Sequence, residues 1–129
     1  MAGSALLDTS AAAALLRGDP AISDRLKTLA EVYTSVVVIG ELMYGARLSA
    51  NSASNLERVA AFAAAVPVLP IDQGTSAVYA NTKRALRAKS RPIPDNDLWI
   101  ASAALQHGLS LVHRDAHFDE IEELASITW

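Results

Sequence analysis

The chain has 129 residues, a net charge of −3, no cysteine and 51% hydrophobic residues. The length fits one domain spanning residues 1–129, the apolar content excludes a disordered chain, and the absence of cysteine excludes a disulfide scaffold and a thiolate metal site. No apolar stretch approaches the roughly 20 residues that a membrane-spanning helix needs, and the N-terminus lacks the pattern of a signal peptide, so we expect a cytoplasmic protein with no membrane partner.

Short apolar segments alternate with helical stretches along the chain. The expected strands are Ala5–Leu7, Val32–Thr34, Val66–Ile71, Leu109–His113 and Ile127–Trp129. The expected helices are Ala11–Leu16, Ile22–Ala30, Val36–Arg47, Asn55–Ala65, a long one from Asp72 towards Ser90, and Asp95–His107. This alternation is typical of an α/β domain with a mainly parallel central sheet of about five strands.

Capping and breaking residues set the expected ends of these helices. Ser35 and Asp72 are suited to cap the helices that follow them. Pro92 and Pro94 enforce an extended connection, and Gly108 stands where a helix C-cap is expected.

Four acidic residues occupy positions that a parallel sheet would bring together. Asp8 and Asp115 follow strand segments, and Asp97 lies in the first turn of the last predicted helix. Glu41 stands in an otherwise apolar helical segment, where a carboxylate is costly unless it is paired or bound to a metal. Sites in open α/β sheets form at the carboxyl ends of strands. The four acids are therefore candidates for one common site.

Each acid also has a purely structural interpretation. Asp8 can cap a helix, Asp97 can interact favourably with the positive end of a helix dipole, and Asp115 can be an ordinary loop residue. If the four converge, their repulsion requires protonation or a bound cation. Oxygen ligands favour Mg²⁺ or Mn²⁺ over zinc, and such a cation is suited to phosphodiester hydrolysis.

Four sequence segments occur in a characteristic order: LLDTS from Leu6, GEL from Gly40, IPDNDLWIA from Ile93 and LVHRDAHF from Leu111. In this order and spacing they resemble the PIN-domain ribonucleases of the VapC toxin type, over nearly the whole chain. The sequence departs from the family's common pattern at His113, where many relatives have Thr or Ser, and at His117, where many have Asp.

The resemblance implies a PIN-like three-layer α/β/α domain and Mg²⁺-dependent endoribonuclease activity, with Mn²⁺ as a substitute. The substrate would be a structured cellular RNA of the tRNA or rRNA class, cut to leave 5′-phosphate and 3′-hydroxyl ends. A homodimer and a cognate VapB-type antitoxin are also implied. The catalytic and metal-binding residues carried over are Asp8, Glu41, Asp97 and Asp115, with Ser10 or Thr9 orienting water or metal.

A basic stretch precedes the third motif. The candidate RNA-binding residues are Lys83, Arg84, Arg87, Lys89 and Arg91, together with Arg114 beside the fourth acid. The alternative is a solvated helix end whose cations interact favourably with the negative, C-terminal end of the helix dipole. Elsewhere, Trp99 is interpreted as core or dimer packing, and Met43, Tyr44 and Phe62 as core.

Several rival functions are weaker. A haloacid-dehalogenase phosphatase needs a second Asp at position 10, where Ser10 stands. A receiver domain needs a mid-chain Asp and a late Lys, which the sequence lacks. A metal-free mechanism would use two histidines as acid and base. The alternative kept open is a non-catalytic PIN-like binding module that acts through partner recognition.

Overall fold

The computed structural model describes residues 2–129. The strands are β1 (Ala2–Leu7), β2 (Leu29–Ser35), β3 (Val68–Leu69), β4 (Ser110–Val112) and β5 (Ser126–Ile127). The helices are α1 (Thr9–Leu16), α2 (Pro20–Leu26), α3 (Val36–Leu48), α4 (Ser52–Ala65), α5 (Gln73–Ala88) and α6 (Asp95–Gln106), and a 3₁₀ helix, η1, covers Ala116–Glu120.

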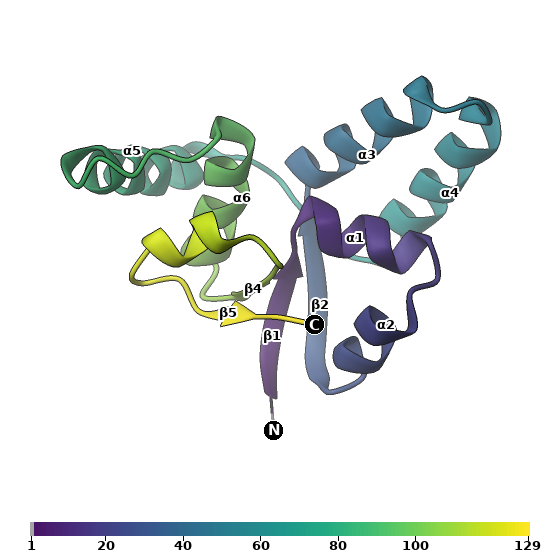
Figure 1. The fold of residues 1–129 in the computed structure, drawn as a ribbon, viewed down its shortest axis with the longest axis horizontal. Coiled ribbons are helices and arrows are strands. Elements are labelled where there is room, and N and C mark those ends of the chain that lie inside the picture. Colours follow the sequence, from purple (N-terminus) through teal and green to yellow (C-terminus); the bar gives the residue numbers. More distant parts are fainter. Residues whose placement is uncertain (1) are drawn as a thin grey trace.

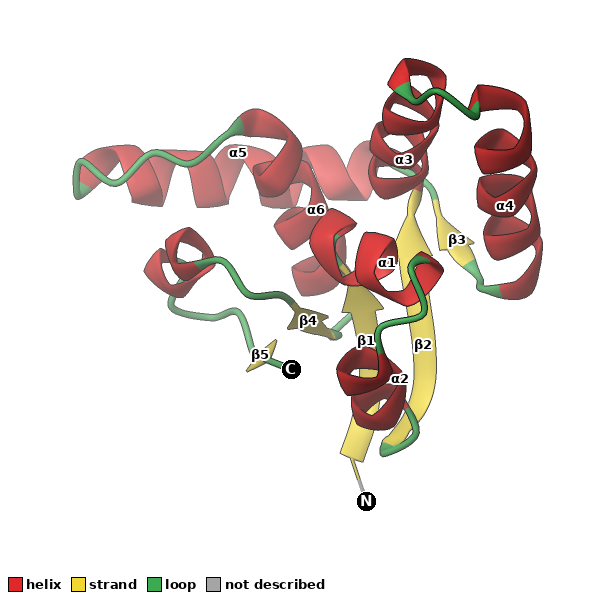
Figure 2. Ribbon diagram, turned by 45° about the vertical axis from the view of Figure 1, so that its right-hand side comes forward, coloured by secondary structure: helices red, strands yellow, loops and turns green. Residues whose placement is uncertain are grey.

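The five strands form one sheet in the order β3-β2-β1-β4-β5, and every neighbouring pair is parallel. Helices α1 and α2 lie in front of this sheet and α5 lies behind it in Figure 2, while the α3–α4 hairpin projects away from α5 and α6 in Figure 1. Right-handed crossovers explain this arrangement, because reversing the direction of strand addition moves the helices to the opposite face. The predicted α/β/α architecture with a parallel sheet is confirmed.

The predicted caps form. The Ser35 hydroxyl accepts from the Val38 N–H at 3.3 Å, and Asp72 forms a reciprocal capping box with Thr75 at the start of α5. Gly108 follows α6 with a φ of +65°, a left-handed conformation that glycine adopts without strain. Local sequence signals thus placed these helix ends correctly.

The largest errors in the predicted boundaries concern one strand and one helix. The expected strand Val66–Ile71 contains only β3, because Pro67 and Pro70 flank it and proline has no N–H to extend a ladder. The expected helix to Ala30 ends at Leu26 instead, because β2 begins at Leu29 and pairs with β1. Strand pairing here overrides a helical periodicity that continues in the sequence.

The core lies between the sheet and the helices, and Phe62 belongs to it as predicted. The interpretation of Met43 and Tyr44 as core was wrong, since they are 41% and 67% exposed on the projecting α3. Helix α3 buries Val38, Leu42 and Ala46 instead, one stripe at helical spacing. Within residues 2–129, no helix has both the length and the apolar character to cross a membrane.

Candidate metal site

The four predicted acids meet beside the switch point of the sheet. Strand β1 lies between β2 and β4, and the strand order reverses beside it: the chain continues from β1 to β2 on one side and later returns to β4 on the other. Sites in open α/β sheets form at the carboxyl ends of the strands at such a point. Asp8 is the first residue after β1, and its N–H donates to the Val112 carbonyl of β4 at 3.2 Å. Asp8 therefore lies at the carboxyl end of β1, beside the end of β4.

Asp8 is buried, with 4% of its surface exposed, and one carboxylate oxygen accepts from the Ala11 N–H at 2.8 Å. Burial is the largest cause that raises the pKa of Asp8, to about 6; the Ala11 hydrogen bond opposes the rise, and the charges of Asp97, Asp115 and Glu41 contribute to it. Such coulombic effects require nearby charges. The fold thus brings all four predicted acids into one electrostatic cluster, and Asp8 also caps α1.

His117 joins two of these acids. Its Nε2 lies 2.8 Å from Asp97 Oδ2 and its Nδ1 lies 3.0 Å from Asp115 Oδ1. Burial raises the pKa of Asp97, while the contact with His117 lowers it. An imidazolium can donate to both carboxylates at once, whereas a neutral ring can donate to one. The ring therefore bridges the third and fourth acids.

Glu41 is held by a different neighbour. The Thr9 hydroxyl donates to Glu41 Oε1 at 2.5 Å, linking the first turn of α1 to the middle of α3. Ser10, the other hydroxyl predicted beside the site, has an exposed side chain. Thr9 is thus the hydroxyl that this structure connects to an acid.

His113 holds the backbone of the fourth acid. Its Nδ1 accepts from the Asp115 N–H at 3.1 Å, and its Nε2 lies 2.8 Å from the Ser126 hydroxyl. Burial lowers the pKa of His113, which favours the neutral ring. Because Nδ1 accepts a hydrogen bond, Nε2 carries the proton and donates to Ser126.

The contacts of His113 and His117 could not be read from the sequence. The one signal was their position two residues before and two residues after Asp115.

The predicted basic stretch is partly neutralised. Lys83 pairs with Asp95 at 3.1 Å, and Lys89 and Arg91 lie 3.6 and 3.9 Å from Glu120 carboxylate oxygens. In the part of the chain that the structure describes, Arg84 and Arg87 form no ion pair. Arg114 stacks on Trp129 instead. The six candidates therefore form no single basic surface.

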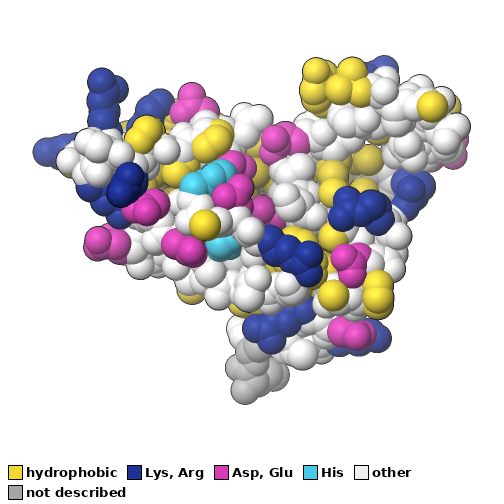
Figure 3. All heavy atoms as spheres, in the orientation of Figure 1, with side chains coloured by type: hydrophobic (Ala, Val, Ile, Leu, Met, Phe, Trp, Pro, Cys, Tyr) yellow, Lys and Arg dark blue, Asp and Glu magenta, His cyan; other side chains and the backbone are white. Residues whose placement is uncertain are grey.

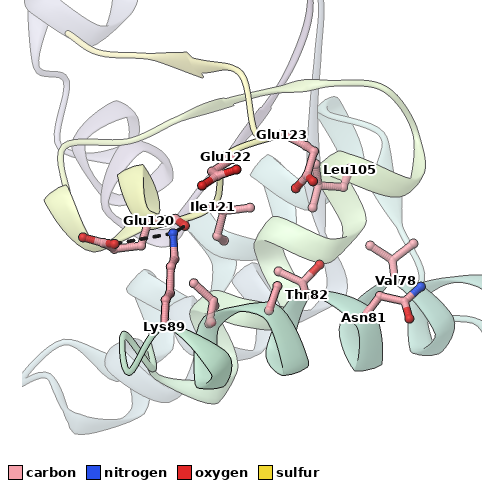
Figure 4. A pocket seen from close by; sticks show the side chains of 11 residues that line it. Val78, Asn81, Thr82, Lys89, Leu105, Glu120, Ile121, Glu122 and Glu123 are labelled. Atoms are coloured by element: carbon pink, nitrogen blue, oxygen red, sulfur yellow. Dashed lines mark hydrogen bonds and ion pairs between the residues drawn. The ribbon is translucent and has the colours of Figure 1, made fainter.

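One well-defined pocket lies away from the acids (Figure 4). Its volume is about 360 Å³, and apolar residues of α5 form its floor, with the Lys89–Glu120 pair at its side. The acidic cluster instead lies on an open face, where acidic and histidine side chains gather between the α5–α6 part and the α3–α4 hairpin (Figure 3). An open acidic face suits a macromolecular substrate better than a small enclosed ligand.

The donor set fits a divalent cation. Carboxylate oxygens are the ligands that Mg²⁺ and Mn²⁺ prefer, and imidazole is a common ligand for the softer transition metals. Ligand atoms of Asp97, Asp115 and His117 all lie within 4.8 Å of one another. A cation would also relieve the repulsion that raises the pKa of Asp8.

Known proteins share this architecture. The sequence matches the PIN domain family over residues 5–124. It is 31% identical to ribonuclease VapC4 of Mycobacterium tuberculosis over 73% of this chain and 74% of that protein. The structure resembles DNA-bound VapBC from Salmonella typhimurium with a TM-score of 0.90 and 26% identity, covering 100% of this chain and 99% of that one.

A further neighbour is VapBC-5 of Mycobacterium tuberculosis, a member of the VapBC family of toxin–antitoxin systems. The TM-score is 0.76 and the identity 28%, over 97% of this chain and 96% of that one. The family match covers more than half of the chain, and it includes the positions of all four acids. The chain therefore belongs to the PIN-domain family, among its VapC-type members.

Proposed function

We propose that this VapC-type protein is a Mg²⁺-dependent endoribonuclease, the toxin of a toxin–antitoxin pair, acting on structured RNA of the tRNA or rRNA class. The observation that carries the proposal is the electrostatic cluster at the switch point, where burial, together with the charges of the three other acids, raises the pKa of Asp8. Carboxylates gathered in this way are stable at neutral pH when a cation is bound among them.

The relatives support the biological part of the proposal. One is named a ribonuclease, and another is described as a member of a family of toxin–antitoxin systems. By extension, we propose a VapB-type antitoxin as the partner of this chain and a homodimer as its assembly.

The proposed metal ligands are Asp8, Glu41, Asp97 and Asp115, acting directly or through water. A divalent cation held there supplies charge neutralisation at a phosphate and lowers the pKa of a water molecule. Thr9 keeps Glu41 in place, and His113 keeps the Asp115 loop in place. His117 can carry a proton at Nδ1 or Nε2 between two carboxylates.

A metal-free mechanism with two histidines receives less support. His113 is buried and both of its ring nitrogens are engaged, by Asp115 N–H and by Ser126. His107 is exposed at the end of α6. His117 alone would have to serve as both acid and base, and it already faces two carboxylates.

The test is cleavage of total cellular RNA by purified, antitoxin-free protein, with Mg²⁺, with Mn²⁺ and with EDTA. We expect discrete cuts with 5′-phosphate ends that need the metal and disappear in Asp97→Asn. Circular dichroism of the variant checks that its fold is intact. Cleavage that survives EDTA would contradict the metal site, and absence of cleavage would favour the binding module.

A further inference from the structure

A second hollow opens directly beside the acidic cluster. It has a volume of about 540 Å³, and the loop after β4 and the residues around β5 form its walls. Asp115 belongs both to this hollow and to the acidic cluster. When one part of a substrate is bound at the acids, the neighbouring part of the same molecule can therefore reach this hollow.

One wall is a planar cation fixed on an aromatic ring. The Arg114 guanidinium carbon lies 4.2 Å from the centre of the Trp129 ring, and Arg114 Nε donates to the Trp129 carbonyl at 2.8 Å. The Arg114 side chain is exposed and lines the hollow, so its guanidinium group is accessible to a ligand there. Nucleobases stack on guanidinium planes of this kind, as they do on aromatic rings.

The other walls offer hydrogen-bonding groups. Asp119 is an exposed acceptor, and Thr128 adds a hydroxyl. The Ser126 hydroxyl, 2.8 Å from His113 Nε2, also lines the hollow. The hollow therefore combines a stacking plane with both acceptors and donors.

We propose that this hollow is a nucleobase subsite, which holds the base of the nucleotide next to the phosphate cleaved. The inference rests on the proposed ribonuclease function and adds base recognition to it. Asp115 and Asp119 disfavour a second phosphate there because like charges repel. A carboxylate accepts from exocyclic amino groups such as N4 of cytosine. The subsite thus prefers an amino-bearing base, cytosine, over uracil.

The test uses the fluorescence of Trp129. The chain has two tryptophans, and Trp99 is stacked on Tyr79 at 3.8 Å, away from the hollow-lining residues. In a Trp99→Phe background, Trp129 is the one remaining tryptophan. Titration with cytidine monophosphate should change its emission saturably, with a dissociation constant about fivefold lower than for uridine monophosphate.

Two variants separate recognition from general charge. Asp119→Asn should abolish or reverse the preference for cytidine, because an amide can donate to O4 of uracil. Arg114→Lys keeps the charge but loses the planar guanidinium, and it should weaken both nucleotides by at least about fivefold. Unchanged preference in Asp119→Asn, or full binding in Arg114→Lys, would overturn the subsite.

The readout does not depend on catalysis. Metal-dependent RNA cleavage by the unmodified protein without a nucleotide effect on Trp129 would overturn the subsite and leave the ribonuclease proposal standing. Saturable, base-selective binding by a protein that cleaves no RNA would support the subsite and contradict the ribonuclease.

Discussion

The acidic cluster and the basic stretch (residues 83–91) are both groups of like charges, yet the fold treats them differently. The acids come from separate elements and converge where one of them is buried. The cations are close in sequence and lie at the surface, where Lys83, Lys89 and Arg91 pair with acids from other elements. The acids meet one another, whereas most of these cations meet an opposite charge.

The difference shows which charges are available for function. A surface ion pair contributes little to the free energy of folding and leaves both charged groups solvated. Buried carboxylates that face each other raise the free energy of the folded state until a proton or a cation neutralises them. Uncompensated charge, more than local charge density, distinguishes the candidate site from the basic stretch.

The strongest test of this comparison is the free energy of unfolding of the Asp8→Asn variant, measured in EDTA so that no metal ion is bound. The pKa of Asp8 rises from 3.8 to about 6 on folding, so the native state binds more protons and its stability falls as pH rises through this window. At pH 7 the variant should be more stable by up to about 3 kcal/mol, at 1.36 kcal/mol per pKa unit. Asn retains the cap of α1.

Urea unfolding at pH 7 and at pH 3.5 measures this difference. The gain should nearly vanish at the lower pH, where Asp8 is protonated in the folded state and mostly protonated in the unfolded state. A gain of equal size at both pH values would show that repulsion and burial of the charge are not its cause.

A His117 variant tests whether a metal ion bound at the acids also uses an imidazole ligand. His117→Ala should weaken Mn²⁺ binding about 10- to 100-fold, measured by isothermal titration, and should affect Mg²⁺ less because Mg²⁺ prefers oxygen. His117→Asp, which replaces the imidazole by a carboxylate, is the matched control and should favour Mg²⁺. Equal Mn²⁺ affinity in wild type and His117→Ala would mean that the ring only balances charge.

The two hydroxyls after Asp8 provide a matched pair. Thr9→Val removes the hydrogen bond to Glu41 and should lower the rate of RNA cleavage about tenfold, because a hydrogen bond to a charged group is lost. Ser10→Ala should leave the rate unchanged, since that side chain is exposed. The opposite order of effects would transfer the orienting role to Ser10.

The smallest effect concerns the basic stretch. Arg84→Ala combined with Arg87→Ala should weaken RNA binding about fivefold and reduce its salt dependence, because each phosphate contact releases counterions. The same double change at Lys89 and Arg91 should do less, since both pair with Glu120. Filter binding of RNA to the Asp97→Asn protein at several salt concentrations compares them. Equal losses of RNA affinity in the two double variants would mean that pairing with Glu120 does not reduce the contribution of Lys89 and Arg91 to RNA binding.

Much of this protein could be predicted from local sequence patterns. The alternation of apolar and helical segments indicated the parallel sheet, and cap residues such as Ser35 and Asp72 placed helix starts. The motif order singled out the four acids, because the segments that contain them resemble the family's pattern in order and spacing. These features depend on residues close in the chain, so the sequence by itself determined them.

Only the tertiary structure decided which side chains meet. His117 contacts Asp97 and Asp115, and Arg114 lies over the Trp129 ring. These contacts depend on how segments that are distant in the sequence pack against one another, which no local pattern predicts. The exposure of Tyr44 depends likewise on how little of α3 the rest of the domain covers. Burial and long-range electrostatics are properties of the packed chain, and they determine which of the predicted charges are neutralised and which remain to bind a ligand.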